Sequence, residues 1–222
     1  MSGRGGSDPE TTSGLARRAV REPRKAVSTA LAVLRGQAYV LWYRLRGIRF
    51  RAGRGFRVYG SLDVRGSGEV ICGAGVAVFG EATPHTYEAT ARIVVGNNVM
   101  MGTARFGCAR EIVVGDDCIL AECSLSDTDH HSARADRRSP LAPVRVAPVS
   151  LGRNVWVGRY AAVLPGCTIG ENSVLAHGAV VMRSFGPNLI IAGNPAKAAA
   201  PIPSAEGQAP PAPLPEPTGH AP

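Results

Sequence analysis

The feature of this sequence that most constrains its fold is a repeat of six residues. Residues 151–186 divide into the blocks LGRNVW, VGRYAA, VLPGCT, IGENSV, LAHGAV and VMRSFG. Every block opens with Leu, Val or Ile, and the fifth residue is small or branched until Phe185 ends the run. A period of six matches neither a helix nor a simple strand, but it suits a short strand followed by a turn.

The same phase extends upstream through most of the chain. It is clear in VGNNVM and MGTARF (95–106) and in VGDDCI and LAECSL (114–125), and looser from Val58 onward. Three blocks make a triangular coil of about eighteen residues, and stacked coils place the leading apolar residues in one ladder. Gly, Asn and Asp at block positions two to four suit turns, where they adopt positive φ at little cost. The sequence therefore predicts an all-β parallel β-helix over residues 50–202.

One helix and two tails flank this repeat. Within residues 25–47, and most clearly over 26–46, apolar residues recur at alternating spacings of four and three, which predicts an amphipathic helix. These residues are Val27, Leu31, Leu34, Ala38, Leu41 and Leu45. We expect this helix to pack on its own domain or on a neighbouring subunit, with a peripheral membrane contact as the alternative. Residues 1–24 and the Pro-rich residues 203–222 are predicted to be disordered.

Charge and cysteine content limit the partners and the compartment. Residues 1–57 hold 13 Lys or Arg against 3 acidic residues, whereas the remainder holds 12 against 14. A basic segment of this kind meets an acidic substrate, nucleic acid or an anionic membrane, and nothing else in the chain favours nucleic acid. Five cysteines without a C-x-x-C pair, and no signal peptide, indicate a reduced cytoplasmic protein. A peripheral position at the inner face of the membrane is the alternative.

The repeat is interrupted once, between residues 126 and 149. This segment begins SDTDHHSARADRRSP and carries two adjacent histidines, three aspartates and several arginines. Both flanking repeats are intact, so the segment is expected to leave the column as a loop, the kind of element that often carries function. A plain polar turn with exposed histidines is the alternative, but a turn does not require so many inserted residues.

The run from Leu151 to Lys197, which ends in AGNPAK, resembles the hexapeptide-repeat acyltransferases. NVWVG, PGCTIGENSV and GNPAK are similar to the maltose, galactoside and nodulation-factor acetyltransferase branch, and FRVYGSLDVRG looks like capsular and exopolysaccharide O-acetyltransferases. Over residues 50–202 the resemblance implies a left-handed β-helix and acetyl-CoA as acyl donor, with no metal. It also implies a homotrimer in which two subunits share each site.

The segment SDTDHH resembles the Asp-x-Asp-x-His element of that family. By this resemblance His131 is the general base, and His130 ranks second, with a structural or substrate-contact role. Asp127 and Asp129 are expected to orient the imidazole and to stabilise its protonated form. Histidine suits this task because its ordinary pKa lies close to neutrality.

The resemblance also implies contacts to the acyl donor and to the acceptor. Donor contacts are assigned to Arg159, His177, Met182, Arg183 and Lys197. We expect Trp156 outside the column near the loop, packed against sugar or pantetheine, or else against a second subunit. The loop residue Arg134 is expected to meet an acidic acceptor or the donor phosphates. For Arg134 and Lys197 an ordinary solvated position is the alternative.

Together these features predict an acetyl-CoA-dependent O-acetyltransferase acting on a hydroxyl of a sugar or glycan precursor, of the capsule or exopolysaccharide type. Transfer is expected to be direct, without an acyl-enzyme. An N-acetyltransferase of an amino sugar remains open because it needs the same base, as does a non-catalytic β-helix scaffold. A zinc hydratase on the same fold is disfavoured, since it needs three convergent histidines and adjacent residues such as His130 and His131 point apart on a strand.

Overall fold

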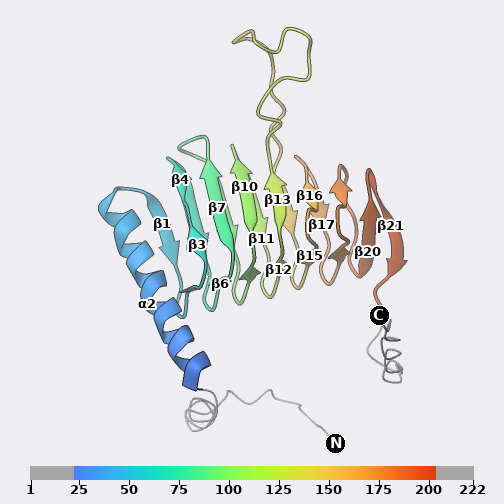
Figure 1. The fold of residues 1–222 in the computed structure, drawn as a ribbon. Helices are drawn as coiled ribbons and strands as arrows, with labels where there is room; N and C mark the ends of the chain where they lie inside the picture. Colours follow the sequence, from blue (N-terminus) through green and yellow to red (C-terminus); the bar gives the residue numbers. More distant parts are fainter. Residues whose placement is uncertain (1–22, 204–222) are drawn as a thin grey trace, which may run out of the picture.

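A computed structural model describes residues 23–203 (Figure 1). The predicted disorder of residues 1–22 and 204–222 therefore concerns residues outside the described part. The described chain forms the predicted left-handed parallel β-helix, a column of about seven coils with one helix across its N-terminal end. Within residues 23–203, no helix combines the length and the hydropathy of a membrane-spanning segment.

Three parallel sheets form the faces of the column. Face A consists of β1 (Arg49–Ala52), β5 (Glu69–Cys72), β8 (Arg92–Val95), β11 (Glu111–Val114), β14 (Val149–Leu151) and β17 (Thr168–Ile169). Face B consists of β2 (Arg57–Val58), β6 (Ala77–Val78), β9 (Met100–Met101), β12 (Ile119–Leu120), β15 (Trp156–Val157), β18 (Val174–Leu175), β20 (Leu189–Gly193) and β21 (Ala196–Pro201). Face C consists of β3 (Ser61–Leu62), β4 (Arg65–Gly66), β7 (Glu81–Thr86), β10 (Ala104–Cys108), β13 (Cys123–Ser126), β16 (Ala162–Val163) and β19 (Val180–Val181). Among these strands only β20 and β21 pair antiparallel.

The core follows the six-residue repeat. The leading residues of the blocks point inward and are fully buried: Leu151, Val157, Val163, Ile169, Leu175 and Val181. The fifth residues are buried as well, at the corners between the faces: Val155, Ala161, Cys167, Ser173 and Ala179. Parallel pairing stacks each rung on its counterpart, for example Val157 on Leu175 and Val163 on Val181. Small and branched side chains fill this narrow interior, as the sequence predicted.

The corner between faces A and B is a column of left-handed residues. Asn98, Asp117, Asn154, Asn172 and Asn188 all have φ between +56° and +61°. Their side chains also stack, because the Asn154 amide donates to Asn172 Oδ1 at 3.0 Å and the Asn172 amide donates to Asn188 Oδ1 at 3.2 Å. Asn and Asp tolerate this conformation better than other residues with a side chain. The predicted turn positions are thus confirmed.

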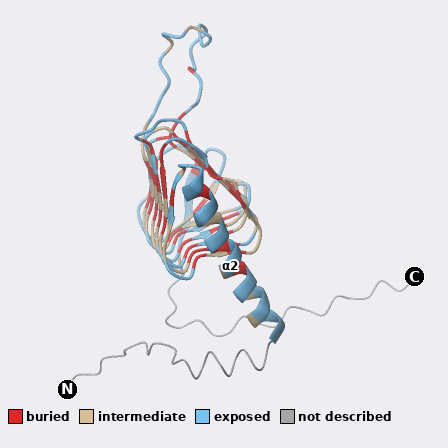
Figure 2. Ribbon diagram, turned by 90° about the vertical axis from the view of Figure 1, so that its left-hand side faces the viewer, coloured by how far each residue is buried: buried red, intermediate tan, exposed pale blue. Residues whose placement is uncertain are grey.

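The helix α2 (Pro23–Leu45) lies across the end of the column, and its outer surface is exposed (Figure 2). The predicted helix is confirmed, and it packs on the first coil through residues outside the predicted apolar face. Ala32, Gly36 and Tyr43 are buried against the first coil, whereas the predicted face remains largely exposed. The small residues allow close approach, and the Tyr43 hydroxyl donates to the Leu62 carbonyl at 2.7 Å. Close backbone contact and this hydrogen bond therefore decide the orientation of α2.

Gly36 is the point of closest approach between α2 and the column. A Cβ added there would lie 2.6 Å from the Phe56 carbonyl oxygen. We expect Gly36→Ala to lower the free energy of unfolding by about 1–2 kcal/mol, because the overlap outweighs the better helix propensity of alanine. Urea unfolding followed by circular dichroism measures this loss. Gln37→Ala, on an exposed neighbour, is the control and should cost nothing; equal effects of the two changes would contradict the prediction.

Candidate active site

Residues 127–148 project from the column between β13 and β14 as a narrow arm, in which the outgoing and the returning chain lie side by side (Figures 1 and 2). The chain leaves the column after Ser126, the last residue of β13, and returns at Val149, the first residue of β14. The base of the arm is held by backbone hydrogen bonds from Asp129 N–H to the Arg145 carbonyl at 3.1 Å and from Ala147 N–H to the Asp127 carbonyl at 2.8 Å. The arm leaves at the corner between faces C and A, and its base is therefore fixed to the column.

Asp127 anchors the base of the arm to the preceding coil. Its carboxylate is fully buried and accepts hydrogen bonds from the backbone N–H groups of Ala109, Arg110 and Glu111 at 2.7, 2.7 and 2.6 Å. Within residues 23–203 no hydrogen bond joins Asp127 or the exposed Asp129 to an imidazole. The buried carboxylate thus accepts hydrogen bonds from the backbone. Within the protomer it makes no hydrogen bond to an imidazole that would support its predicted role in orienting the general base.

The two histidines occupy different environments. His130 has φ of +60°, and its Nε2 lies 3.4 Å from Ser126 Oγ. Its ring meets the Tyr87 ring edge to face at 4.9 Å between centroids and packs closely on Gly107, where a Cβ would lie 3.0 Å from Cε1 of the imidazole. Both histidines are exposed, but for His131 the hydrogen bond is a backbone one, from its N–H to the Asp129 carbonyl at 2.7 Å. The structure therefore places His130, rather than His131, against the column.

His130 lines a hollow of about 390 Å³ on face C, here called the histidine hollow. Its other lining residues are Asp63, Arg65, Glu81, Thr83, His85, Tyr87, Arg105, Phe106, Gly107, Ser124 and Ser126. Charged groups of both signs and several hydroxyls surround the space, which suits a ligand with many hydroxyl groups better than an apolar one.

Most residues of this hollow were not predicted from the sequence. His85 and Tyr87 lie on and just after β7, with ring centroids 4.4 Å apart. The available signal was a second, smaller irregularity, because the six-residue phase breaks between Glu81 and Val95. Outward-facing residues of a regular strand, such as Arg105, leave no trace in the repeat and could not be selected in this way.

A second hollow of about 340 Å³ adjoins the first and shares Arg105 and Ser124 with it. Its remaining lining residues are Thr103, Glu122, Cys123, Tyr160, Ala161 and Ala162. The two hollows run across face C, from the corner that carries the arm toward the corner shared with face B. We call these two adjoining hollows together the groove of face C.

Two of the predicted donor contacts meet at the far end of this groove. Arg159 donates to Glu122 at 2.8 Å and lies over the Tyr160 ring at 5.4 Å from its centroid. His177 meets the same ring edge to face at 5.1 Å. The hydrogen bond from Arg159 lowers the pKa of the Glu122 carboxyl. Tyr160, which was not among the predicted site residues, therefore joins Arg159 and His177 into one cluster.

The other predicted donor contacts lie elsewhere. Met182 and Arg183 follow β19 at the corner between faces C and A, and Arg183 lies over the Phe185 ring at 5.2 Å from its centroid. Lys197 is exposed on β21 of face B. The five residues thus do not converge within one protomer.

The two predicted acceptor contacts, Trp156 and Arg134, lie in different parts of the protomer. Trp156 lies outside the column, as expected, but on face B, so within the protomer it does not border the arm. Arg134 lies on the arm and forms a two-pronged ion pair with Asp136, at 3.0 and 3.1 Å. A site that uses these residues together requires more than one subunit.

The cysteines do not offer a nucleophile. All five are free and buried. Burial raises the pKa of Cys72, Cys108 and Cys123 to about 12, so these thiols remain protonated near neutrality. Within residues 23–203, no group of three His, Cys, Asp or Glu side chains is arranged to hold a metal ion. The titratable groups of the groove are therefore its histidines, carboxylates and tyrosines.

Comparison with known proteins connects this architecture to a family. Residues 148–183 match the family described as bacterial transferase hexapeptide (six repeats). The chain is 33% identical over 87 residues to the galactoside O-acetyltransferase of Escherichia coli, a match that covers 39% of this chain and 42% of that enzyme. The chain thus spans less than half the length of this relative.

Two solved structures share the fold. AntD, an N-acyltransferase from Bacillus cereus in complex with dTDP and 3-hydroxybutyryl-CoA, has a TM-score of 0.61 at 15% identity, over 73% of this chain and 88% of that one. The polySia specific acetyltransferase NeuO has a TM-score of 0.50 at 20% identity, over 72% and 86%. The six-residue repeat, the column that it builds and the match over residues 148–183 thus make the chain similar to the hexapeptide-repeat transferases.

Proposed function

We propose that the protein is an acetyl-CoA-dependent O-acetyltransferase that acts on a hydroxyl of a sugar or glycan precursor. The observation that carries this proposal is the imidazole of His130 in a polar hollow, at the base of the arm of a hexapeptide column. The name of the galactoside O-acetyltransferase supports a sugar acceptor and acetyl transfer to oxygen. The charged and hydroxylated lining of the histidine hollow supports the same class of acceptor.

We assign the general base to His130, in place of the first-ranked His131. In this mechanism the imidazole removes the proton of the acceptor hydroxyl while the oxygen attacks the thioester carbonyl of acetyl-CoA. The tetrahedral intermediate collapses as the carbon–sulfur bond breaks, and the leaving thiolate takes the proton from the imidazolium. Ser126 and Tyr87 hold the ring in place. No acyl-enzyme is needed, which agrees with the raised pKa values of the buried thiols.

We further propose a homotrimer, supported by an apolar ladder on face B. Met100, Ile119 and Trp156 pair rung over rung, and they are 45, 42 and 51% exposed. A ring of three copies uses two different surfaces of each copy. Face B of one subunit would then cover face C of the next, and Trp156 would border the groove of its neighbour. The site would be shared between two subunits, with the donor lying between them.

Charge on this ladder tests the trimer. We expect Ile119→Glu to release monomers, because a carboxylate in the centre of an apolar interface costs several kcal/mol. Sedimentation velocity measures the change, and Thr168→Glu, on exposed face A, should leave the assembly intact. A trimer that survives Ile119→Glu would rule out face B as the interface.

Gly107 makes room for the His130 ring. A Cβ at this position would lie 3.0 Å from His130 Cε1 and 3.1 Å from its Nε2. We expect Gly107→Val to displace the imidazole and to lower kcat/KM roughly tenfold or more, since a misplaced base transfers protons poorly. The thermal midpoint should change little, because Gly107 is on the outer surface of β10. An unchanged kcat/KM would contradict the position assigned to the base.

Acetyl transfer is tested directly with acetyl-CoA and a panel of acceptors. The panel pairs each sugar with the amino sugar that replaces one hydroxyl by an amine, and release of the CoA thiol is followed. Faster release with the hydroxyl member, together with an acetyl ester in the product, is the expected result. Preference for the amine would favour an N-acetyltransferase. A failure to bind CoA would favour a scaffold without catalysis.

A further inference from the structure

The outer side of α2 carries an unpaired apolar stripe. Val27, Leu31, Leu34, Leu41 and Leu45 are each more than half exposed. Together with Ala38 and Trp42 they follow one side of the helix, opposite to the residues that contact the column. We call these seven residues the outer stripe. A solvated apolar surface of this length on a single helix calls for a partner.

Basic residues border this stripe. Residues 23–57 contain nine Lys or Arg and no Asp or Glu. At 100° per residue, Arg24 and Arg35 lie to one side of the stripe and Arg44 to the other. The Arg46 guanidinium lies over the Trp42 ring, 5.4 Å from its centroid. The surface is therefore apolar along its centre and positive along its edges, which complements a layer of anionic lipid.

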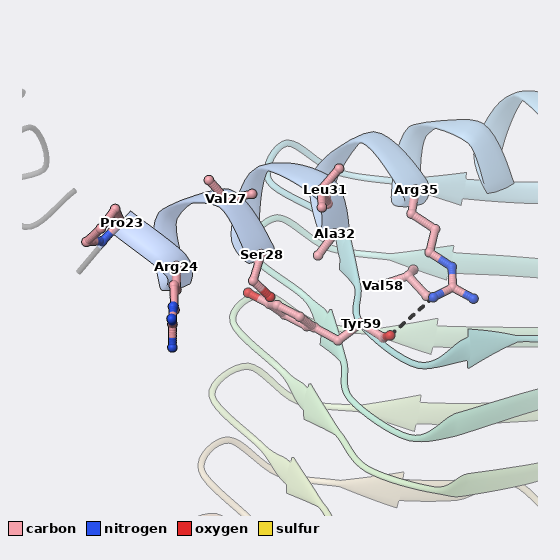
Figure 3. Close-up of a pocket in the computed structure, with 9 residues that line it drawn as sticks. All are labelled: Pro23, Arg24, Val27, Ser28, Leu31, Ala32, Arg35, Val58 and Tyr59. Carbon is pink, nitrogen blue, oxygen red and sulfur yellow. Dashed lines mark hydrogen bonds between the residues drawn. The ribbon is translucent and has the colours of Figure 1, made fainter. Parts of the chain in front are cut away.

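A separate cleft opens beside the outer stripe, between α2 and the first coil. Its volume is about 530 Å³, and it is lined by Pro23, Arg24, Val27, Ser28, Leu31, Ala32, Arg35, Val58 and Tyr59. Figure 3 shows Val27 and Leu31 pointing away from the strands, and Arg35 reaching across to the Tyr59 carbonyl at 3.2 Å. Apolar walls with arginines at the rim suit a lipid chain whose anionic headgroup stays outside.

The position of α2 separates this surface from the subunit interface. The helix lies across the end of the column, and its exposed side faces along the column axis (Figure 2). Copies packed side by side through faces B and C bury the sides of the column and leave its end free. In such an assembly the three stripes would face in the same direction and form one flat surface.

From these observations we propose that α2 rests on an anionic membrane surface through its outer stripe. The apolar side chains enter the region between headgroups and acyl chains, while the bordering arginines meet lipid phosphates. This inference goes beyond acetyl transfer and does not depend on it. The test therefore measures lipid binding alone.

The test is co-sedimentation of the full chain with vesicles. Vesicles of equal parts phosphatidylglycerol and phosphatidylcholine should pellet the protein, vesicles of phosphatidylcholine alone should pellet much less, and added salt should release it. Trp42 fluorescence should shift to the blue on binding, and Trp42→Phe should remove most of that shift. Leu34→Glu with Leu41→Glu should weaken binding roughly tenfold or more, because both apolar contacts are lost. Arg24→Gln and Arg35→Gln should each weaken it about fivefold.

Two comparisons make the outcome decisive. Thr168→Glu adds a carboxylate on face A, away from the stripe, and should leave lipid binding unchanged. Equal binding to both vesicle types, full binding by the double leucine variant, or no binding at all would overturn the proposal. Should the double leucine variant instead lose an assembly that the native chain forms without lipid, the stripe would be an interface between copies, and the membrane proposal would be wrong.

Discussion

His130→Ala is expected to reduce kcat/KM for acetyl transfer by roughly 100- to 10,000-fold, the range that general bases contribute. The reason is positional. The His130 ring lines the histidine hollow, 3.4 Å from Ser126 Oγ and in edge-to-face contact with Tyr87. His131 is exposed on the arm and lines neither hollow of face C. Proton removal requires a base within hydrogen-bond distance of the acceptor hydroxyl, and His130 meets that condition for a ligand in this hollow.

His131→Ala is the matched control, because it removes an identical side chain one residue away. We expect it to retain kcat/KM within about tenfold, since exposed positions outside the hollow contribute little to proton transfer. Thiol release from acetyl-CoA measures both variants, and their thermal midpoints show that each is folded. The reverse ranking would return the base to His131, acting on the groove of a neighbouring subunit. Full activity of both variants would overturn general-base catalysis by this element.

The column itself was predictable because its energetics are local and repeated. Each leading Leu, Val or Ile has the same environment as its counterpart one coil away, so the sequence repeats wherever the structure does. The same reasoning located the arm, since a long insertion is conspicuous against a strict period. Turn residues such as Asn154 and Asn172 were identifiable for a further physical reason, their tolerance of positive φ.

The orientation of α2 was not predictable from apolar spacing. Periodicity identifies which residues share a side of the helix, but it does not say which side contacts the column. Here the deciding residues are Ala32 and Gly36, whose small size permits close approach, and Tyr43, whose hydroxyl bonds the Leu62 carbonyl. Burial of these residues outweighs burial of the leucines, and the leucines are left for another partner.

A pattern of residue types could not predict which of the two histidines, His130 or His131, lies against the column. That choice depends on the left-handed backbone at His130 and on the space above Gly107, which come from different coils. Most residues that line the histidine hollow could not be predicted from the sequence, for a related reason. Arg65, Glu81 and Arg105 are outward-facing residues, which the core repeat does not constrain. Residues of this kind become a site only when the coils bring them to one face.

Asp127→Ala is expected to lower the free energy of unfolding by roughly 3 kcal/mol or more. The carboxylate is fully buried and accepts three backbone N–H groups, from Ala109, Arg110 and Glu111. Hydrogen bonds to a charged acceptor are stronger than neutral ones, and donors left without a partner carry a desolvation cost. Urea unfolding at a fixed protein concentration measures the loss. The end of the arm that joins the column should also lose its attachment, so that kcat/KM falls along with stability.

Two further variants separate anchoring from chemistry at Asp127. Asp127→Asn keeps one carbonyl acceptor but turns an amide toward backbone donors, and it should lose about half as much stability as Asp127→Ala. Asp129→Ala removes an exposed carboxylate from the same element and should change the free energy of unfolding by no more than about 0.5 kcal/mol. If Asp127→Ala proved as stable as the native chain but inactive, the carboxylate would act on the imidazole as the sequence suggested. Its three backbone bonds would then contribute little to holding the arm.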